Sequence, residues 1–384
     1  LDIEDAFVHA ALRARLNPSG MEEVRQLSSA EHFDWEVVKS LTERREVASF
    51  VYDTLNGKDI IPGSVIEWFH QAYVDTAGRT LFLLTELENV QEVLRSTGIR
   101  VVVLKGASLV GTLYDDIALR PMVDIDLLVD EQDVAVVVKT LVVRGYAHVP
   151  VSPLLSTNAV TLRSEGPIAC EFDIHWHLFK TPHHQNLISM AWFWDTAREL
   201  RIGETSALRL APEAELLYLS AHLAKHGGHS DDLIFRWGYD IAVFLHRHAG
   251  SIDWERTLEQ ARAYQLVQAV NEAVALVDER WGIRIPGFAA RALSALEPTM
   301  EERNAWAAQE SPDKTYHVLR DSIRHRSGFR RLALLTLRAF VPPVSFMKKR
   351  YGIKHRILLP FYYPRRWAEG AIRAFSVWLR DGKS

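Results

Sequence analysis

The spacing of apolar side chains divides the chain into helical regions and one region of strands. Between Thr80 and Ser96 apolar residues recur three and four positions apart, which predicts an amphipathic helix ended by Thr97-Gly98. Residues 100–104 form an uninterrupted β-branched run, as in a buried strand. Residues 123–129 alternate apolar and acidic positions, which predicts a strand with one face toward a core.

The same patterns predict the other elements. One expected helix begins at Asp34-Trp35-Glu36, and two others cover residues 107–114 and 131–144, the latter ending at Gly145. Another helix begins at Pro212, and from there the pattern is helical almost to the end of the chain. The expected strands are a pair at 158–164 and 168–178 and a hairpin at 197–210 around Gly203. We therefore expect an α/β (α+β) fold, with a mixed-sheet core at 99–210 between a helical region at 1–98 and a helical domain at 211–384.

The amino-acid composition is that of a folded protein without internal disulfides. The 384 residues are 48% hydrophobic, which is enough for a substantial core. The single cysteine, Cys170, excludes an internal disulfide, and its place on an expected strand indicates a buried, inert thiol. The N-terminus is charged from Asp2 onward and shows no secretory signal, and no apolar run is long enough to span a membrane. We expect a cytoplasmic protein.

The net charge of −4 hides an asymmetry. From Pro342 to the end there are ten Lys/Arg and two Asp/Glu, so the rest of the chain carries 35 Lys/Arg and 47 Asp/Glu. This basic tail is also rich in aromatic residues. It is either a helical segment packed on the body with a solvated basic face, or a docking surface for an acidic partner, nucleic acid or an anionic membrane.

Two carboxylates on the acidic strand are the strongest chemical signal. Asp124 and Asp126 are two residues apart, so both side chains point to one side of the strand, while Val123, Ile125, Leu127 and Val129 point into the core. Such a pair is costly unless positive charge compensates it. A divalent metal carrying a phosphate substrate would do so. The alternative is a structural pair held by Arg120 and backbone donors.

Neighbouring residues extend this site. Lys105-Gly106 follows the first buried strand and opens a helix, where backbone N–H groups, the Lys105 charge and the Ser108 hydroxyl can contact phosphate. Glu171, Asp173 and His175 share the polar face of a later strand, and one of its carboxylates can complete a three-acid metal cluster. Asp173, in the middle, is the preferred third acid and candidate general base. His175 is either a phosphate contact or a hydrogen-bonded structural histidine.

These residues resemble a known superfamily. The pattern Lys105-Gly106, Arg120, Asp124-x-Asp126 and Asp173-Ile174-His175-Trp176 is similar to the nucleotidyltransferase fold, in its bacterial branch labelled "nucleotidyltransferase family protein". That branch begins the motif with Lys-Gly where better-known relatives have Gly-Ser. The resemblance implies a mixed-sheet core, Asp124, Asp126 and Asp173 as metal ligands, Lys105 and Gly106 as the phosphate turn, and a role in modifying natural products or peptides.

Downstream residues are open to more than one interpretation. His222 and His226 lie four apart, but a zinc site is disfavoured because Leu223, not Glu, follows His222. We place Lys225 and His226 instead at a cleft facing nucleotide or acceptor. Arg236 and Asp240 are interpreted as an intrahelical ion pair, and Trp237 as a core residue. His183-His184 is either a substrate-gating loop or surface.

The sequence therefore predicts an enzyme that binds a nucleoside triphosphate, with ATP preferred, together with Mg²⁺ or Mn²⁺. It would transfer the nucleoside monophosphate to a hydroxyl of a small molecule, peptide or protein and release pyrophosphate. Lys105, the Gly106 turn and Arg120 are the candidates that would hold the phosphate charge. The alternative is an inactive module that binds a nucleotide or a partner and docks through its basic tail. A nucleic-acid polymerase is disfavoured, because the acidic body offers no long phosphate-binding surface.

Overall fold

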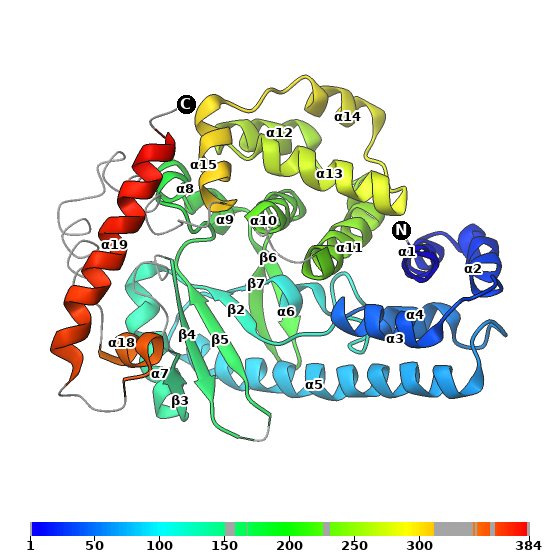
Figure 1. Cartoon of the computed structure of the whole chain (residues 1–384), viewed down its shortest axis with the longest axis horizontal. Helices are drawn as coiled ribbons and strands as arrows, with labels where there is room; N and C mark the ends of the chain where they lie inside the picture. Colours follow the sequence, from blue (N-terminus) through cyan, green and yellow to red (C-terminus); the bar gives the residue numbers. More distant parts are fainter. Residues whose placement is uncertain are drawn as a thin grey trace.

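The structure is a computed structural model, and it describes residues 2–149, 158–166, 168–225, 231–310, 341, 344–353 and 358–381. Helices come first along the chain, followed by a seven-stranded mixed sheet with short helices in its connections, and then by further helices (Figure 1). This order confirms the mixed α/β fold that the apolar pattern predicts.

The N-terminal region is helical, as expected. Its α-helices are α1 (Ile3–Leu16), α2 (Met21–Ser28), α3 (Trp35–Arg44), α4 (Ala48–Leu55) and α5 (Gly63–Ser96), with a 3-10 turn η1 (Pro18–Gly20) after α1. Helix α3 opens where the sequence predicts, because the Asp34 carboxylate accepts a hydrogen bond from the Glu36 N–H. Helix α5 begins well before Thr80, so the amphipathic stripe marks only its second half.

The sheet contains the predicted strands and both predicted strand pairs. The strands are β1 (Val102–Leu104), β2 (Ile125–Leu128), β3 (Tyr146–His148), β4 (Ala159–Ser164), β5 (Glu171–His175), β6 (Arg198–Ile202) and β7 (Thr205–Arg209). Their order across the sheet is β3-β4-β5-β2-β1-β7-β6. The β2–β5 and β1–β7 neighbours are parallel and the others antiparallel, so the two acid-bearing strands lie side by side and run in one direction.

Several predicted elements are shorter than expected. Strand β2 starts at Ile125, and the side chain of Val123 is 49% exposed, so its predicted place in the core is wrong. Ile168, before β5, is also exposed. Both residues precede the paired part of their strand, where the sheet and its covering helices no longer enclose them. The connecting helices are α6 (Lys105–Leu109), η2 (Glu131–Asp133), α7 (Val134–Val143), α8 (Pro182–Leu187) and α9 (Ala191–Asp195).

Two helical layers enclose the sheet. Helices α5 and α7 cover one face, where Leu87 and Leu141 join a core with Ile125 and Phe172. The other face is covered by N-terminal helices together with helices of the C-terminal region, which share one apolar core. The C-terminal helices are α10 (Pro212–Lys225), α11 (Asp231–His248), α12 (Trp254–Ala263), α13 (Val267–Trp281), α14 (Gly287–Ser294), α15 (Met300–Glu310), α18 (Val344–Tyr351) and α19 (Leu359–Asp381). Helices from the region at 1–98 and from the region at 211–384 therefore pack together on this face of the sheet.

Two further expectations concern burial. Cys170 is fully buried, and burial raises the pKa of its thiol to about 12, which confirms an inert residue. Among the described helices, none combines the length and the apolar composition that are needed to cross a bilayer.

Glu215 gives the fold a pH dependence that can be measured. It is buried in α10, and burial raises the pKa of its carboxyl to about 8. Because the pKa is raised in the folded state, the folded protein holds the proton of Glu215 more tightly than the unfolded chain does. The contribution of this proton to the free energy of unfolding is complete below the ordinary pKa of 4.5 and is lost as the pH rises toward 8. Each pH unit in this window corresponds to roughly 1.4 kcal/mol. We expect Glu215→Gln to reduce, by a few kcal/mol, the fall in the free energy of unfolding between pH 5 and pH 8.

Urea unfolding at several pH values within this window tests the expectation. Glu259→Gln is a matched control, because Glu259 is exposed on α12. The control should keep the wild-type pH dependence. An unchanged pH dependence in Glu215→Gln would contradict the role given to the buried carboxyl.

Candidate functional site

A cavity of about 590 Å³ lies between the sheet and the C-terminal helices. One side is built from β2, β4, β5 and the start of α6, and the other from α10, α11, α15 and the segment after β5. A volume of this size suits a small-molecule ligand. Most polar residues singled out in the sequence line this space.

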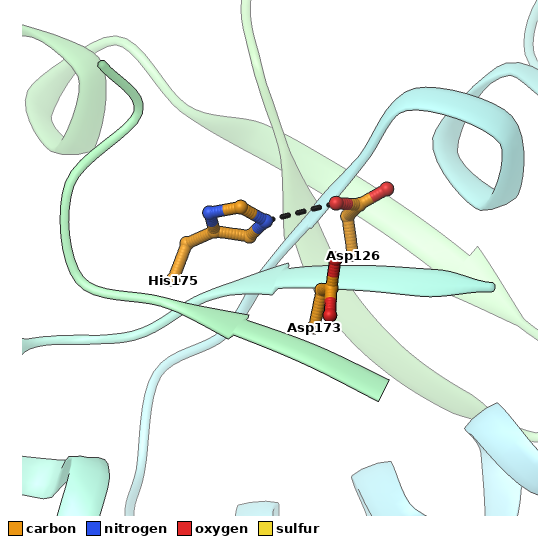
Figure 2. Close-up of side chains that lie close together, drawn as sticks. All are labelled: Asp126, Asp173 and His175. Carbon is orange, nitrogen blue, oxygen red and sulfur yellow. Dashed lines mark hydrogen bonds and ion pairs between the residues drawn. The ribbon is translucent and has the colours of Figure 1, made fainter. Parts of the chain in front are cut away.

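Two predicted acids meet on the floor of the cavity. Strands β2 and β5 are parallel neighbours, and their register places Asp126 directly beside Asp173. Figure 2 shows both carboxylates and the His175 ring converging above the two strands. One potential ligand atom from each residue lies within 4.8 Å of the others, which is close enough for a shared metal ion. Asp124, just before β2, lines the same cavity.

The Lys105 ammonium compensates the most buried acid. Its Nζ lies 2.6 Å from Asp126 Oδ1, and the Asp126 side chain is only 3% exposed. Burial alone would raise the pKa of Asp126, but Lys105 and His175 hold it well below its ordinary value. The backbone φ of Lys105 is 48°, in the left-handed region that non-glycine residues rarely adopt. This local strain occurs at the residue that supplies the compensating charge.

His175 is also bound to Asp126. Its Nε2 lies 2.8 Å from Asp126 Oδ1. On the other side of the ring, Asn158 Nδ2 lies 3.5 Å from Nδ1 and donates to the His177 carbonyl, so Nδ1 faces a donor. From these neighbours we assign a proton to Nε2, which donates to Asp126. The structure thus places His175 as a hydrogen-bonded partner of an acid, which was one of its two interpretations.

The remaining acids differ in their surroundings. Burial and the nearby Asp126 charge raise the pKa of Asp124 to about 7. Asp173 lines the cavity and accepts a hydrogen bond from the Thr161 hydroxyl on β4. Glu171, two residues earlier, instead pairs with Arg163 and is not part of the cavity lining. The geometry therefore favours Asp173 over Glu171 as the third acid.

Lysines line the walls around the acids. Lys225, at the end of α10, and Lys180, after β5, both line the cavity with Lys105. Burial, together with the charges of Lys180 and Lys105, lowers the pKa of Lys225 to about 7. His226, predicted as its partner, lies outside the described residues. The cavity thus combines carboxylates on its floor with ammonium groups that can contact an anionic ligand.

A model of the family described as "Uncharacterised nucleotidyltransferase" matches residues 31–282. This range is about two thirds of the chain and contains the acids and the three lysines of the cavity. The chain belongs to this family. The resemblance noted in the sequence is thereby confirmed for the family, which supports a transferase.

A solved structure is also similar to this nucleotidyltransferase family member. It is an antigenic nucleotidyltransferase-like protein from Paracoccidioides brasiliensis, with 16% sequence identity and a TM-score of 0.36. The match covers 54% of this chain and 95% of the other. No curated protein matches the chain.

The turn at Lys105-Gly106 differs in detail from the turn that the sequence predicts. Gly106 lines the cavity, and a Cβ at this position would lie 3.0 Å from Met122 Cγ, so close packing with Met122 favours glycine there. Ser108 is buried in α6 and is not part of the cavity lining, so its predicted hydroxyl contact to phosphate is not supported.

Arg120 has a buried partner of its own. Its guanidinium Nη2 lies 2.7 Å from Asp240 Oδ2, and Nε also donates to that carboxylate, which accepts a further hydrogen bond from Tyr114. Arg120 lines the cavity, but the charge of its guanidinium is already compensated by Asp240, so it is not an uncompensated cation for the acid pair or for phosphate. The predicted intrahelical pair of Arg236 with Asp240 is wrong, because Arg236 pairs with Glu46. A pattern four residues apart could not reveal either long-range partner.

Two of three aromatic predictions are also corrected. His183 and His184 form neither a gating loop nor surface, because both are buried in α8 and bonded to Gln265. Trp237 packs against the large core, as the sequence predicts, but it is only partly buried and also lines the cavity with His222. His184 and Trp237 reach the cavity from helices far apart in the sequence, so the local pattern around each one did not locate it.

Sequence analysis missed several residues that line the cavity. They include Lys180, Asn158, Thr161, Tyr218 and Trp306. One signal was available, since Asn158 and Thr161 fall on the strand predicted to pair with that of Asp173. Lys180, Tyr218 and Trp306 carried no comparable signal.

We expect Arg120→Met to destabilise the fold by about 3–5 kcal/mol, because it leaves the Asp240 carboxylate buried without its cation. The double variant Arg120→Met/Asp240→Leu should recover more than half of that loss, since it removes both charges. Urea unfolding of the wild type, the two single variants and the double variant gives the coupling energy. Additive losses would show that the pair is not the stabilising unit.

Proposed function

We propose that this protein transfers a nucleoside monophosphate from a nucleoside triphosphate, with ATP preferred, to an acceptor hydroxyl. The observation that supports this most is the register of β2 and β5, which sets Asp126 beside Asp173 on the floor of a cavity lined by lysines. Family membership supports a transferase, and the acid cluster supports this particular reaction.

The donor set fits a divalent metal ion. Asp124, Asp126 and Asp173 offer carboxylate oxygens, which are the ligands that Mg²⁺ and Mn²⁺ prefer. His175 fits less well, because its Nε2 proton is engaged with Asp126. A bound ion would neutralise charge on the transferring phosphate and lower the pKa of the attacking hydroxyl. In this proposal the three aspartates hold the ion, and Lys105 and His175 fix the orientation of Asp126.

The transfer itself balances with the groups present. The acceptor oxygen forms a bond to the α-phosphorus, the bond from that phosphorus to the bridging oxygen breaks, and pyrophosphate leaves. In this proposal Asp173 takes the proton of the attacking hydroxyl, as a general base. The Thr161 hydroxyl, bonded to Asp173 Oδ1, orients that carboxylate.

The cationic wall would hold the phosphate charge. Lys225 and Lys180 line the cavity together with the acids, and so does the Lys105-Gly106 turn. Such groups stabilise the negative charge that develops on pyrophosphate as it leaves. The acceptor in this proposal is a hydroxyl of a small molecule, a peptide or a protein.

The first test compares nucleotide binding by the wild type and Asp173→Asn. We expect titration calorimetry in MgCl₂ to show metal-dependent binding of one nucleoside triphosphate, weakened at least about tenfold in the variant because a metal ligand is lost. Asp126 is a poorer choice, since replacing it leaves Lys105 partly buried without its carboxylate.

Glu171→Gln is the matched control, because it alters the same face of β5 two residues away but outside the cavity lining. It should bind like the wild type. If folded wild-type protein bound no nucleoside triphosphate with Mg²⁺ or Mn²⁺, the transferase proposal would fail, and an inactive module that binds a partner would be favoured. Binding without transfer of an α-phosphate label to any acceptor would favour an inactive nucleotide-binding module.

A second test separates phosphate binding from nucleoside binding. Lys225→Gln should weaken binding of the triphosphate about tenfold or more and change binding of the monophosphate much less, because a charge-assisted contact to phosphate is removed. Lys139→Gln, on the exposed face of α7, is the control and should have no effect. Equal losses for both nucleotides would assign Lys225 to another part of the ligand.

A further inference from the structure

The described C-terminal helices form a small unit with its own core. Helices α18 and α19 pack together through Met347, Ile353 and Leu359, with Tyr351 and Tyr362 against them. This cluster is separate from the two large cores of the body. In Figure 1, α19 runs along the edge of the molecule with α18 beside its first half.

The two faces of α19 differ in character. Leu359 and Tyr362 pack toward α18, whereas Phe361 is 75% exposed and Trp367 is 45% exposed. Pro360, Pro364 and Ala368 are exposed as well. At 100° per residue these five positions fall within one broad sector of the helix. The described part of α19 therefore presents a continuous apolar and aromatic face away from the unit's own core.

In the sequence of the rest of α19, apolar and aromatic residues recur at helical spacing. Ala371, Phe375 and Trp378 continue the same spacing up to Asp381, where α19 ends. A helix of 23 residues with one apolar face is long enough to present a large docking surface. A solvated tail would not require aromatic residues on this face.

Positive charge accompanies the apolar face. The segment from Pro342 onward holds ten Lys/Arg and two Asp/Glu. One of those acids, Glu369, is already paired with Arg350 and Arg365 and accepts a hydrogen bond from Tyr351. The segment that contains α18 and α19 is therefore strongly basic in its sequence, whereas the remainder of the chain is acidic.

We propose that α19 docks on the surface of an anionic phospholipid bilayer, with Phe361 and Trp367 inserted at the interface. A helix with aromatic residues on one face and arginines on the other is suited to lie in the plane of the headgroups. Tryptophan favours that boundary, and basic residues are attracted to anionic headgroups. The helix lies on the bilayer rather than crossing it, since none of the described helices can span a membrane.

A bilayer explains the two features together better than nucleic acid does. Binding to a phosphate backbone depends mainly on Lys and Arg and does not require a broad apolar face that includes proline and alanine. An anionic bilayer uses the charge and the apolar face at once. This inference is independent of the proposed catalytic reaction.

Flotation of the full chain with lipid vesicles tests the proposal. We expect the partition coefficient for vesicles of phosphatidylcholine with about 30% phosphatidylglycerol to exceed that for pure phosphatidylcholine at least tenfold, and to fall at high salt. Phe361→Ser/Trp367→Ser should lower binding to the anionic vesicles about tenfold or more, because two interfacial side chains are lost.

Phe288→Ser is the matched control, since Phe288 is 60% exposed on α14, outside the basic tail. It should bind vesicles like the wild type, and circular dichroism should show that every variant is folded. Equal binding to neutral and anionic vesicles, no binding to either, or unchanged binding of the double variant would overturn the proposal. Tight binding to single-stranded RNA without vesicle binding would also overturn it and assign the tail to nucleic acid.

Discussion

The burial of negative charge on one face of two neighbouring parallel strands is the constraint on which this structure depends. Asp126 and Asp173 are side by side in the register of β2 and β5, and Asp124 lines the same cavity. In a poorly solvated site such carboxylates raise one another's pKa unless cations compensate them. Lys105 does so for Asp126, and it follows β1 directly through a left-handed backbone. The strained backbone at Lys105 is thus explained by the position that it gives the ammonium group beside Asp126.

The cations around the cavity divide into two groups with different physical roles. Arg120 and Arg236 line the cavity too, but each is buried and paired with a carboxylate of its own, Asp240 or Glu46, which compensates its charge. Lys180 and Lys225 line the space itself, and burial beside like charge lowers the pKa of Lys225. A positive group whose charge is unfavourable in the free protein gains most when an anion arrives. This supports a phosphate ligand on the lysine side.

The pattern of apolar, polar and turn residues correctly predicted features that depend only on neighbouring residues in the sequence. Alternation placed Asp124 and Asp126 on one side of a strand, and turn residues located both strand pairs. It could not give the partners of Arg120 and Arg236, because those contacts join segments more than a hundred residues apart. Lys180 was missed for the same reason, since it lines the cavity only because the distant helix α10 packs nearby. The prediction that Val123 is buried was wrong for a different reason. Alternation shows on which face of a strand a residue lies, but not where the helices that cover that face end.

The family match divides the residues of the cavity into those inside and those outside the matched range. Residues 31–282 include the acids and the three cavity lysines, so the groups that would perform transfer in the proposed reaction all lie inside it. Trp306, on α15, closes one side of the cavity from outside that range, in ring contact with His184. The basic tail also lies outside it. The charged floor and the Trp306 side of the cavity are therefore built from different segments, one inside and one outside the matched range, so a substitution at Trp306 can change the shape of the cavity without altering the acids.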